Sequence, residues 1–311
     1  MLDEPELDIA TVAAYVRQGW GLDVTLRFLP IGYDAAAWAY EATAAGERYF
    51  VKLRRGAPGP GPAVARYLRD GGLAAVLAPL PTRAGPPYHQ AGGWSLLLHP
   101  FVDGDDAWRD GLTDEQWTEF GAFLGALHAT PPPPGVALPR ETYEAPAVAF
   151  VRAHEPEPAE GVRAEFAAAW RSHLDATLAL ADRVERLGRA AAAAAPPPVL
   201  CHADAHGANL MIEPSGRLHV VDWDEVVLAP RERDLLFVLG PAFGERPPTP
   251  AQLDRFRRGY GALDADPVVL GFLRDRRVLD DIAEFARGVA RPDASEESRR
   301  GDLRWFRRQF G

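Results

Sequence analysis

The sequence predicts an α+β protein in which a small sheet-rich part is followed by a larger, mainly helical part. In the first hundred residues the apolar and β-branched runs are short and bounded by turn residues, as strands are. After Asp103-Gly104, apolar residues recur at helical spacing over long segments. We therefore expect one lobe at 1–102, a second at 103–311, and a connection between them at 98–104.

The first lobe is expected to be mainly sheet. Helices are predicted at Ile9–Gln18 and Ala63–Leu68, and extended segments at Val24–Pro30, Trp38–Thr43, Arg48–Leu53, Val76–Pro81 and Trp94–Val102. Glycine pairs mark two boundaries: Gly71-Gly72 ends the second helix, and Gly92-Gly93 forms the turn between hairpin arms.

The second lobe begins with a helix that has a clear start signal. Thr113 can cap it, and Gln116 stands three residues later, where a reciprocal capping box needs it. The proline run at 131–134 follows this helix. Further helices are predicted within Val162–Ala195 and at Gln252–Tyr260, Val268–Val289 and Ser298–Phe310.

Composition restricts the partners and the compartment. The 44 acidic and 34 basic residues give a formal charge of −10, which disfavours nucleic acid or an anionic membrane as partner and favours cationic ligands. A single cysteine, Cys201, allows no intramolecular disulfide. Every apolar run is shorter than a membrane span, and the acidic start lacks a secretion signal. We expect a cytoplasmic monomer or homodimer.

Lys52 is the only lysine in the chain, and the other basic residues are all arginine. The abundance of alanine, glycine and proline suggests a coding bias that replaces lysine wherever arginine serves. A lysine that survives such a bias is a candidate functional residue. It lies in the predicted strand Arg48–Leu53.

The densest group of polar residues in an apolar setting is the segment VLCHADAHGANLMI at 199–212, which LHVVDWDEVV follows from residue 218. Short apolar strands are predicted at Val199–Cys201, Leu210–Ile212 and Leu218–Val221. They bracket polar loops and place four side chains at strand ends, where they can converge: His202, Asp204, Asn209 and Asp222.

These residue types match the needs of phosphoryl transfer from a nucleotide. The reaction needs a carboxylate near the acceptor hydroxyl, oxygen ligands for Mg²⁺ and a cation on the phosphates. Asp204, then Asn209 five residues later, then Asp222 supply a base and two metal ligands in that order, and Lys52 supplies the cation. The spacing His-x-Asp-x-x-x-x-Asn is the specific part of the pattern.

The loop sequence HADAHGAN resembles the catalytic loop of the aminoglycoside phosphotransferase family, relatives of the protein kinases. The later segment VVDWDEVVLAPRERDLLF is similar to the spectinomycin-phosphotransferase branch of that family. The similarity extends to LPIGYDAAAWAYEA, RYFVKL, LLLHPFVDG and GLTDEQWTEFGAFLGALHA. The resemblance implies a bilobal protein-kinase-like fold, with a small antiparallel-sheet N-terminal lobe that binds nucleotide and a larger helical lobe with the acceptor site.

The resemblance also implies roles for the residues of the loop. Asp204 would accept or orient the proton of the substrate hydroxyl, and His202 would mainly brace the loop. Asn209 and Asp222 would hold Mg²⁺, and Lys52 would contact the α and β phosphates.

Other roles follow from the same resemblance. The loop at Gly32 would cover the nucleotide, and backbone groups of Pro100 and Val102 would bind the adenine edge. Asp234 would anchor the catalytic loop from the helix that follows.

One feature departs from the family pattern. Its members usually pair the strand lysine with a glutamate on the next helix, but the expected place near Pro62-Ala63 holds no acid. The alignment is shifted, or another acid serves, or the nucleotide alone holds Lys52. Asp70 and Glu41 are the nearest acids in the sequence.

The acceptor is expected to be cationic or polyhydroxylated, and two acidic groups are candidates to bind it. Asp280, Asp281 and Glu284 lie on one predicted helix, and Asp103, Asp105 and Asp106 lie at the end of the connection and just past it. Asp224 is a candidate for metal or substrate. A solvated helix face explains the first group equally well.

The leading hypothesis is a Mg²⁺-dependent O-phosphotransferase that uses ATP or GTP to modify a small aminoglycoside or aminocyclitol antibiotic, which would give resistance or self-protection. An alternative is a kinase of another small hydroxylated metabolite: a nucleoside antibiotic, a sugar or an amino alcohol. Two other classes remain open. One is a zinc hydrolase built on His202, Asp204, His206, Asp222 and Asp224. The other is a nucleotide-binding protein without catalysis.

Overall fold

The computed structural model describes residues 4–31, 36–157, 159–194, 196–240, 242–292 and 294–311. The chain forms two compact units, which we describe separately. The larger unit contains Leu2–Glu141 and Pro197–Asp264, and the helical unit contains Thr142–Pro196 and Ala265–Gly311. None of the helices within the described ranges is long and apolar enough to cross a membrane.

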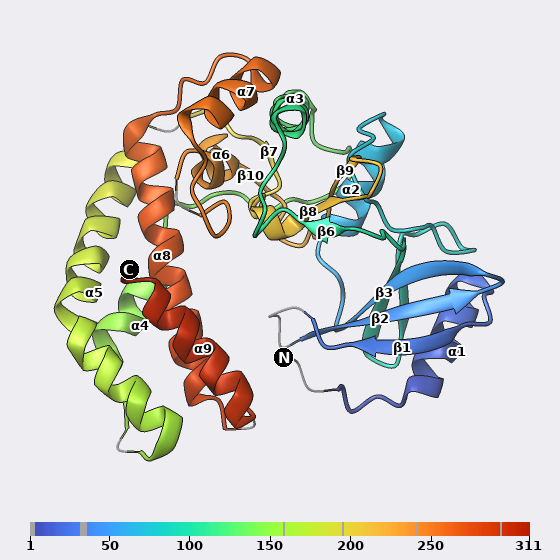
Figure 1. Ribbon diagram of the computed structural model, residues 1–311, viewed down its shortest axis with the longest axis horizontal. Helices are drawn as coiled ribbons and strands as arrows, with labels where there is room; N and C mark the ends of the chain where they lie inside the picture. The colour runs from blue at the N-terminus through green and yellow to red at the C-terminus, as the bar shows by residue number, and fades with distance from the viewer. Residues whose placement is uncertain (1–3, 32–35, 158, 195, 241, 293) are drawn as a thin grey trace. The chain divides into compact units, whose positions relative to one another are not determined.

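The N-terminal part of the larger unit is a five-stranded antiparallel sheet (Figure 1). Its strands lie in the order β1-β2-β3-β5-β4. Their bounds are Thr25–Leu29 (β1), Ala37–Ala44 (β2), Glu47–Arg55 (β3), His89–Ala91 (β4) and Trp94–Pro100 (β5). The predicted sheet-rich start of an α+β protein is therefore confirmed.

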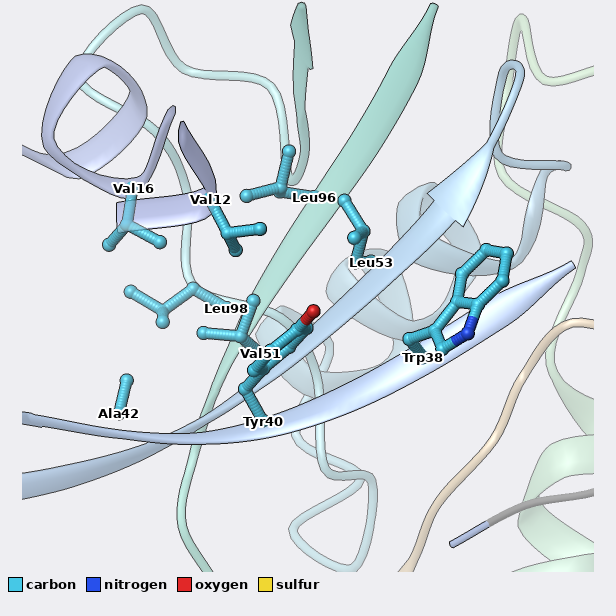
Figure 2. Close-up of a cluster of buried hydrophobic side chains, with 9 residues drawn as sticks. All are labelled: Val12, Val16, Trp38, Tyr40, Ala42, Val51, Leu53, Leu96 and Leu98. Carbon is cyan, nitrogen blue, oxygen red and sulfur yellow. The ribbon is translucent and has the colours of Figure 1, made fainter. Parts of the chain in front are cut away.

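The two faces of this sheet have different roles. Side chains alternate along a strand, so Val51 and Leu53 of β3 point to one face. They pack with Leu96 and Leu98 of β5 and with helix α1 (Ile9–Trp20). Together these side chains form the core shown in Figure 2. Lys52 lies between these core residues in β3, opposite Leu97 of β5, and therefore points to the other face.

One predicted strand of this region is wrong. The hairpin turn at Gly92-Gly93 is confirmed, but the arm that pairs with β5 is β4 and not Val76–Pro81. In the predicted segment only Val76 forms an isolated bridge, with Val220. Pro79 and Pro81 have no N–H to donate, so a regular ladder cannot continue there.

The rest of the larger unit surrounds the polar loops. Helix α2 (Gly61–Asp70) follows the sheet, and α3 (Asp114–Ala129) begins with the predicted Thr113–Gln116 capping box. The remaining elements are β6 (Asp105–Asp106), β7 (Val199–Cys201), the 3₁₀ turn η1 (Gly207–Asn209), β8 (Leu210–Ile212), β9 (Leu218–Val220), β10 (Val227–Ala229), α6 (Glu232–Val238) and α7 (Pro250–Tyr260). Strand β8 pairs with β6 and β9, and β7 pairs with β10.

Two glycines allow a close contact between helices α3 and α7 in this unit. A Cβ added at Gly121 of α3 would lie 2.1 Å from the Phe256 carbonyl oxygen of α7, and one at Gly259 would lie 1.9 Å from that of Thr118. The two helices therefore pack backbone to backbone. The loop that carries Asp204 follows β7, which also packs against α3.

The helical unit consists of α4 (Ala147–Ala153), α5 (Gly161–Ala194), α8 (Pro267–Ala290) and α9 (Glu296–Arg308). The long helices α5 and α8 lie side by side (Figure 1). Trp170 of α5 stacks on Phe306 of α9 with 5.8 Å between ring centroids. The helices predicted for this region are confirmed, whereas α4 was not predicted.

Candidate active site

Asp204 and Asn209 are joined within the loop that follows β7. The Asn209 side-chain Nδ2 donates to the Asp204 backbone carbonyl oxygen at 2.8 Å and to Asp204 Oδ2 at 3.0 Å. The short turn η1 brings the two residues together. Because the amide nitrogen is held in this way, Oδ1 is the Asn209 atom that can coordinate a metal ion.

His202 connects this loop with the segment that carries Asp222. Its imidazole is buried; Nε2 lies 2.9 Å from the Val221 carbonyl oxygen, and the Asp204 backbone N–H points to Nδ1 at 3.3 Å. A carbonyl can only accept and an amide N–H can only donate, so these partners assign the proton to Nε2 and leave Nδ1 as acceptor. The imidazole thus links the loop backbone at Asp204 with the backbone just before Asp222.

Asp234 holds the backbone of the same loop. This fully buried carboxylate of α6 accepts hydrogen bonds from the backbone N–H groups of His202 at 3.0 Å and Ala203 at 2.6 Å. His128 of α3 lies 3.0 Å from it through Nε2 and 2.9 Å from the Tyr260 hydroxyl through Nδ1. Burial alone would raise the pKa of Asp234, but these partners hold it below its ordinary value.

Two residues of the site have backbone conformations that L-amino acids rarely adopt. Ala203 has φ 68° and Asp222 has φ 58°, both in the left-handed region. Such conformations persist where the surroundings determine them strongly, and they cluster at functional sites. Two hydrogen-bonded neighbours, Asp234 beside Ala203 and Lys52 beside Asp222, supply that restraint.

Lys52 lies between two carboxylates. Its Nζ is 2.9 Å from Asp222 Oδ1 and 2.9 Å from Asp224 Oδ2, and Arg54 Nη1 is 2.7 Å from the same Asp224 oxygen. Burial would lower the pKa of Lys52, but the two carboxylates raise it above its ordinary value. The same ion pair overcomes the effect of burial on Asp222 and lowers its pKa.

The acids that we considered from the sequence as partners of Lys52 are engaged elsewhere. Glu41 forms ion pairs with Arg27 and Arg48. Asp70 pairs with Arg66 along α2. Neither is the partner of Lys52 in this structure, where its carboxylate partners are Asp222 and Asp224.

The connection offers main-chain groups for a ligand. The Phe101 N–H donates to the Arg48 carbonyl oxygen at 3.2 Å, which extends the pairing of β3 with β5. Pro100 has no N–H and can offer only its carbonyl, whereas Val102 has both groups. The predicted nucleotide residue Gly32 lies outside the described residues.

The acidic residues at the end of the connection and just past it make contacts within the protein. Asp103 forms an ion pair with Arg48. Asp106 Oδ1 accepts from the Trp108 backbone N–H at 2.9 Å, and Asp105 pairs with Ile212 between β6 and β8. These contacts fix the chain beside the catalytic loop.

The other acceptor candidates lie on α8 of the helical unit. Asp281 pairs with Arg277 at 3.1 Å, and Asp280 lies 3.9 Å from Arg276. Glu284, one turn further along, is exposed. Two of these carboxylates thus lie within ion-pair distance of arginines one turn earlier on the same helix.

The geometry does not support the zinc alternative. Within the described ranges, the group of side chains close enough to share a metal ion is His128, Cys201 and Asp234, not the His-x-Asp-x-His loop. Both His202 nitrogens face backbone groups. His206 Nε2 lies 3.4 Å from Asp204 Oδ2, but the described residues do not gather three of the proposed zinc ligands around one point.

Sequence reasoning missed the roles of Arg54 and His128. Arg54 stands two residues after Lys52, so strand alternation could have placed both on one face. His128 meets Asp234 across 106 residues of sequence, and no local pattern signals that contact.

The fold and this site define a small-molecule kinase. The model of the phosphotransferase enzyme family matches residues 25–306, and the chain belongs to that family. Its α+β architecture is protein-kinase-like, with an N-terminal antiparallel sheet and a mainly helical C-terminal part, as the resemblance implied.

Particular relatives are similar over nearly the whole chain. Protein StrN of Streptomyces griseus is 29% identical over 298 residues, which cover 91% of this chain and 84% of that protein. The spectinomycin phosphotransferase APH(9)-Ia in complex with ADP and spectinomycin has a TM-score of 0.87 at 25% identity, covering 99% of this chain and 96% of that one. A microcompartment-associated aminopropanol kinase has a TM-score of 0.63 at 16% identity, covering 96% and 95%, and shows the same fold.

Proposed function

We propose that this enzyme transfers the γ-phosphoryl group of ATP to a hydroxyl of a spectinomycin-like aminocyclitol, with Mg²⁺ as cofactor. The observation that carries the proposal is the convergence of Lys52, Asp222, Asn209 and Asp204 in one compact unit. Similarity to the spectinomycin phosphotransferase over 99% of this chain supports the choice of acceptor. The complexes of that phosphotransferase with ADP and with AMP support an adenine nucleotide.

The donor set fits magnesium. Asn209 Oδ1 and the Asp222 carboxylate are hard oxygen ligands of the kind Mg²⁺ takes beside nucleotide phosphates. The ion supplies charge neutralisation on the phosphate oxygens. The hydrogen bonds of Asn209 with Asp204 fix the orientation of its side chain for this purpose.

Lys52 and Asp204 then have separate tasks. The Lys52 ammonium group neutralises the phosphates of the nucleotide. The Asp204 carboxylate orients the acceptor hydroxyl and takes its proton as the new O–P bond forms and the bond between the γ-phosphorus and the bridging oxygen breaks. His202 and Asp234 hold Asp204 in place through the loop backbone.

The nucleotide base lies, in this proposal, against the connection at 98–104. The Pro100 carbonyl accepts from the adenine amino group, and the Val102 N–H donates to a ring nitrogen.

Antibiotic phosphorylation of this kind gives the host resistance or self-protection. Acidic residues near the connection, among them Asp103 and Asp106, are the proposed neighbours of a cationic acceptor.

The test is a panel of aminocyclitols, aminoglycosides, nucleosides and amino alcohols, each with Mg²⁺ and either ATP or GTP, read by the mass of the phosphorylated product. We expect product with spectinomycin and ATP. Asp204→Ala should reduce turnover by about 10²–10⁴-fold, the contribution of a general base, and leave nucleotide affinity nearly unchanged. Asp254→Ala removes an exposed acid of α7 and serves as the control.

Three results would contradict parts of the proposal. Product with another acceptor class alone would reject the aminocyclitol and retain the kinase. Full activity of Asp204→Ala would reject the assignment of the base. Tight nucleotide binding without product from any acceptor would favour the non-catalytic alternative.

A further inference from the structure

The counter-charges of Lys52 come from a single short segment of the larger unit. Asp222 and Asp224 flank Trp223, and each places one carboxylate oxygen 2.9 Å from Nζ. The Lys52 side chain is 16% exposed, so both contacts act where water screens them only partly. An ammonium group with two such partners has a fixed position.

Helix α2, the next helix after β3, does not supply this function. Its only acid is Asp70, which stands at its last residue and pairs with Arg66. At the first residue of α2, a Cβ added to Gly61 would lie 2.2 Å from the Trp223 carbonyl oxygen. The start of α2 thus packs directly on the main chain that carries the two aspartates.

The two aspartates differ in their further contacts. Asp224 also binds Arg54, at 2.7 Å, and is 23% exposed, whereas the Asp222 side chain is 46% exposed. Lys52 and Arg54 are two residues apart on one strand, so their side chains leave the same face of β3. Asp224 therefore bridges two neighbouring cations.

We propose that Asp224, held by Arg54, is the positioning residue that orients the Lys52 ammonium group for the nucleotide phosphates. The inference rests on the proposed function, because it concerns the phosphate site of that reaction. Asp222 is shared between Lys52 and its proposed role as metal ligand. Asp224 keeps Lys52 in place when Asp222 turns to the metal, and Arg54 compensates the charge of Asp224.

The first experiment measures Mg·ATP affinity without acceptor, by calorimetric titration of the full chain. Asp224→Asn keeps the shape of the side chain and removes its charge. We expect affinity to fall about tenfold, the scale of one charge-assisted hydrogen bond. KM for ATP should rise in parallel, and KM for the acceptor should not change. Glu225→Gln removes the charge of the adjacent exposed acid and should leave both values unchanged.

A double-mutant cycle separates positioning from a general structural effect. In a Lys52→Met background, Asp224→Asn should cause no further loss of Mg·ATP affinity if it acts through the ammonium group. An equal loss with and without Lys52 would overturn the proposal, and so would unchanged affinity in the single variant. If Asp224→Asn does not fold, Arg54→Gln provides the same test. Its control is Arg55→Gln, which changes the next, exposed arginine of β3.

The outcome also distinguishes this inference from the proposed function. A wild-type protein that binds no Mg·ATP and phosphorylates nothing on the panel would reject the function itself. A wild-type protein that binds and transfers normally, together with an unaffected Asp224→Asn variant, would reject only the positioning role.

Discussion

Asp234 is the buried acid on which the shape of the catalytic loop depends, and replacing it should affect stability and turnover together. The carboxylate receives three hydrogen bonds, from the backbone of His202 and Ala203 and from the ring of His128. Asp234→Ala leaves all three donors buried without that acceptor. Asp234→Asn keeps one acceptor oxygen and loses the charge.

The magnitude follows from these contacts. A buried donor that loses its partner costs about 1–3 kcal/mol, and the Ala variant leaves three such donors without their acceptor. Removal of the costly buried carboxylate offsets part of that loss. We expect the free energy of unfolding to fall by about 3–5 kcal/mol in Asp234→Ala and by about 1–3 kcal/mol in Asp234→Asn.

Turnover should fall as well, because the left-handed conformation of Ala203 depends on this anchor. A left-handed backbone costs an alanine about 1–2 kcal/mol, and the Asp234 hydrogen bond at 2.6 Å offsets that cost. Without it, Asp204 no longer stays in register with Asn209. We expect kcat to fall more than nucleotide affinity.

The assay is urea denaturation of the full chain at pH 7 and near pH 3, with Asp254→Asn as the exposed control. The folded-state pKa of Asp234 lies below its ordinary 3.8, so its charge stabilises the protein fully above pH 3.8. That contribution is lost as pH falls through the folded-state pKa. The difference between wild type and Asp234→Asn should therefore shrink at the lower pH. Equal stability of wild type and Asp234→Ala at pH 7 would refute the reasoning.

Three further predictions concern packing, pH and capping. Gly61→Ala should lower stability by about 1–3 kcal/mol through its clash with the Trp223 carbonyl oxygen, and it should also weaken Mg·ATP binding. Gly59→Ala places its methyl group in open space and should have neither effect. Burial, and then the charge of Lys52, lower the pKa of His99 from 6.5 to about 4. The free energy of unfolding of the wild type should therefore fall by up to about 2 kcal/mol between pH 7 and pH 5, whereas that of His99→Leu should not. Denaturation at both pH values measures the difference. Thr113→Ala removes the N-cap of α3 and should cost about 1 kcal/mol in the same assay without changing KM for ATP.

Local patterns predicted most elements because their signals are local. The Thr113–Gln116 capping box and the apolar periodicity of α3 need only neighbours in sequence, and both are confirmed. The arm Val76–Pro81 failed because apolar content alone does not specify a strand partner. His89–Ala91 has a weaker strand pattern but stands directly before the glycine turn, and the turn determined the pairing.

The partners within the site could be predicted only in part. Motif spacing predicted that Asp204 and Asn209 lie near each other. These two residues are five positions apart in the sequence and form two hydrogen bonds. Lys52 and Asp224 are separated by 172 residues in the sequence. Their contact depends on how the sheet packs against the segment Asp222-Trp223-Asp224. That packing depends on Gly61, which has no side chain and so lets α2 approach the Trp223 backbone. Composition does not reveal such a contact between distant parts of the chain.

The contacts of Lys52 explain why arginine did not replace the one lysine of the chain. Lys52 and Arg54 both reach Asp224, but only Lys52 also contacts Asp222 and faces the proposed phosphate site. A compact ammonium group can direct its three donors to two carboxylates and a phosphate, whereas a planar guanidinium has its donors fixed in one plane. Arg54 needs one direction, toward Asp224, and there a guanidinium serves. The bias toward arginine was therefore resisted where two carboxylates and, in the proposed function, a phosphate share one cation.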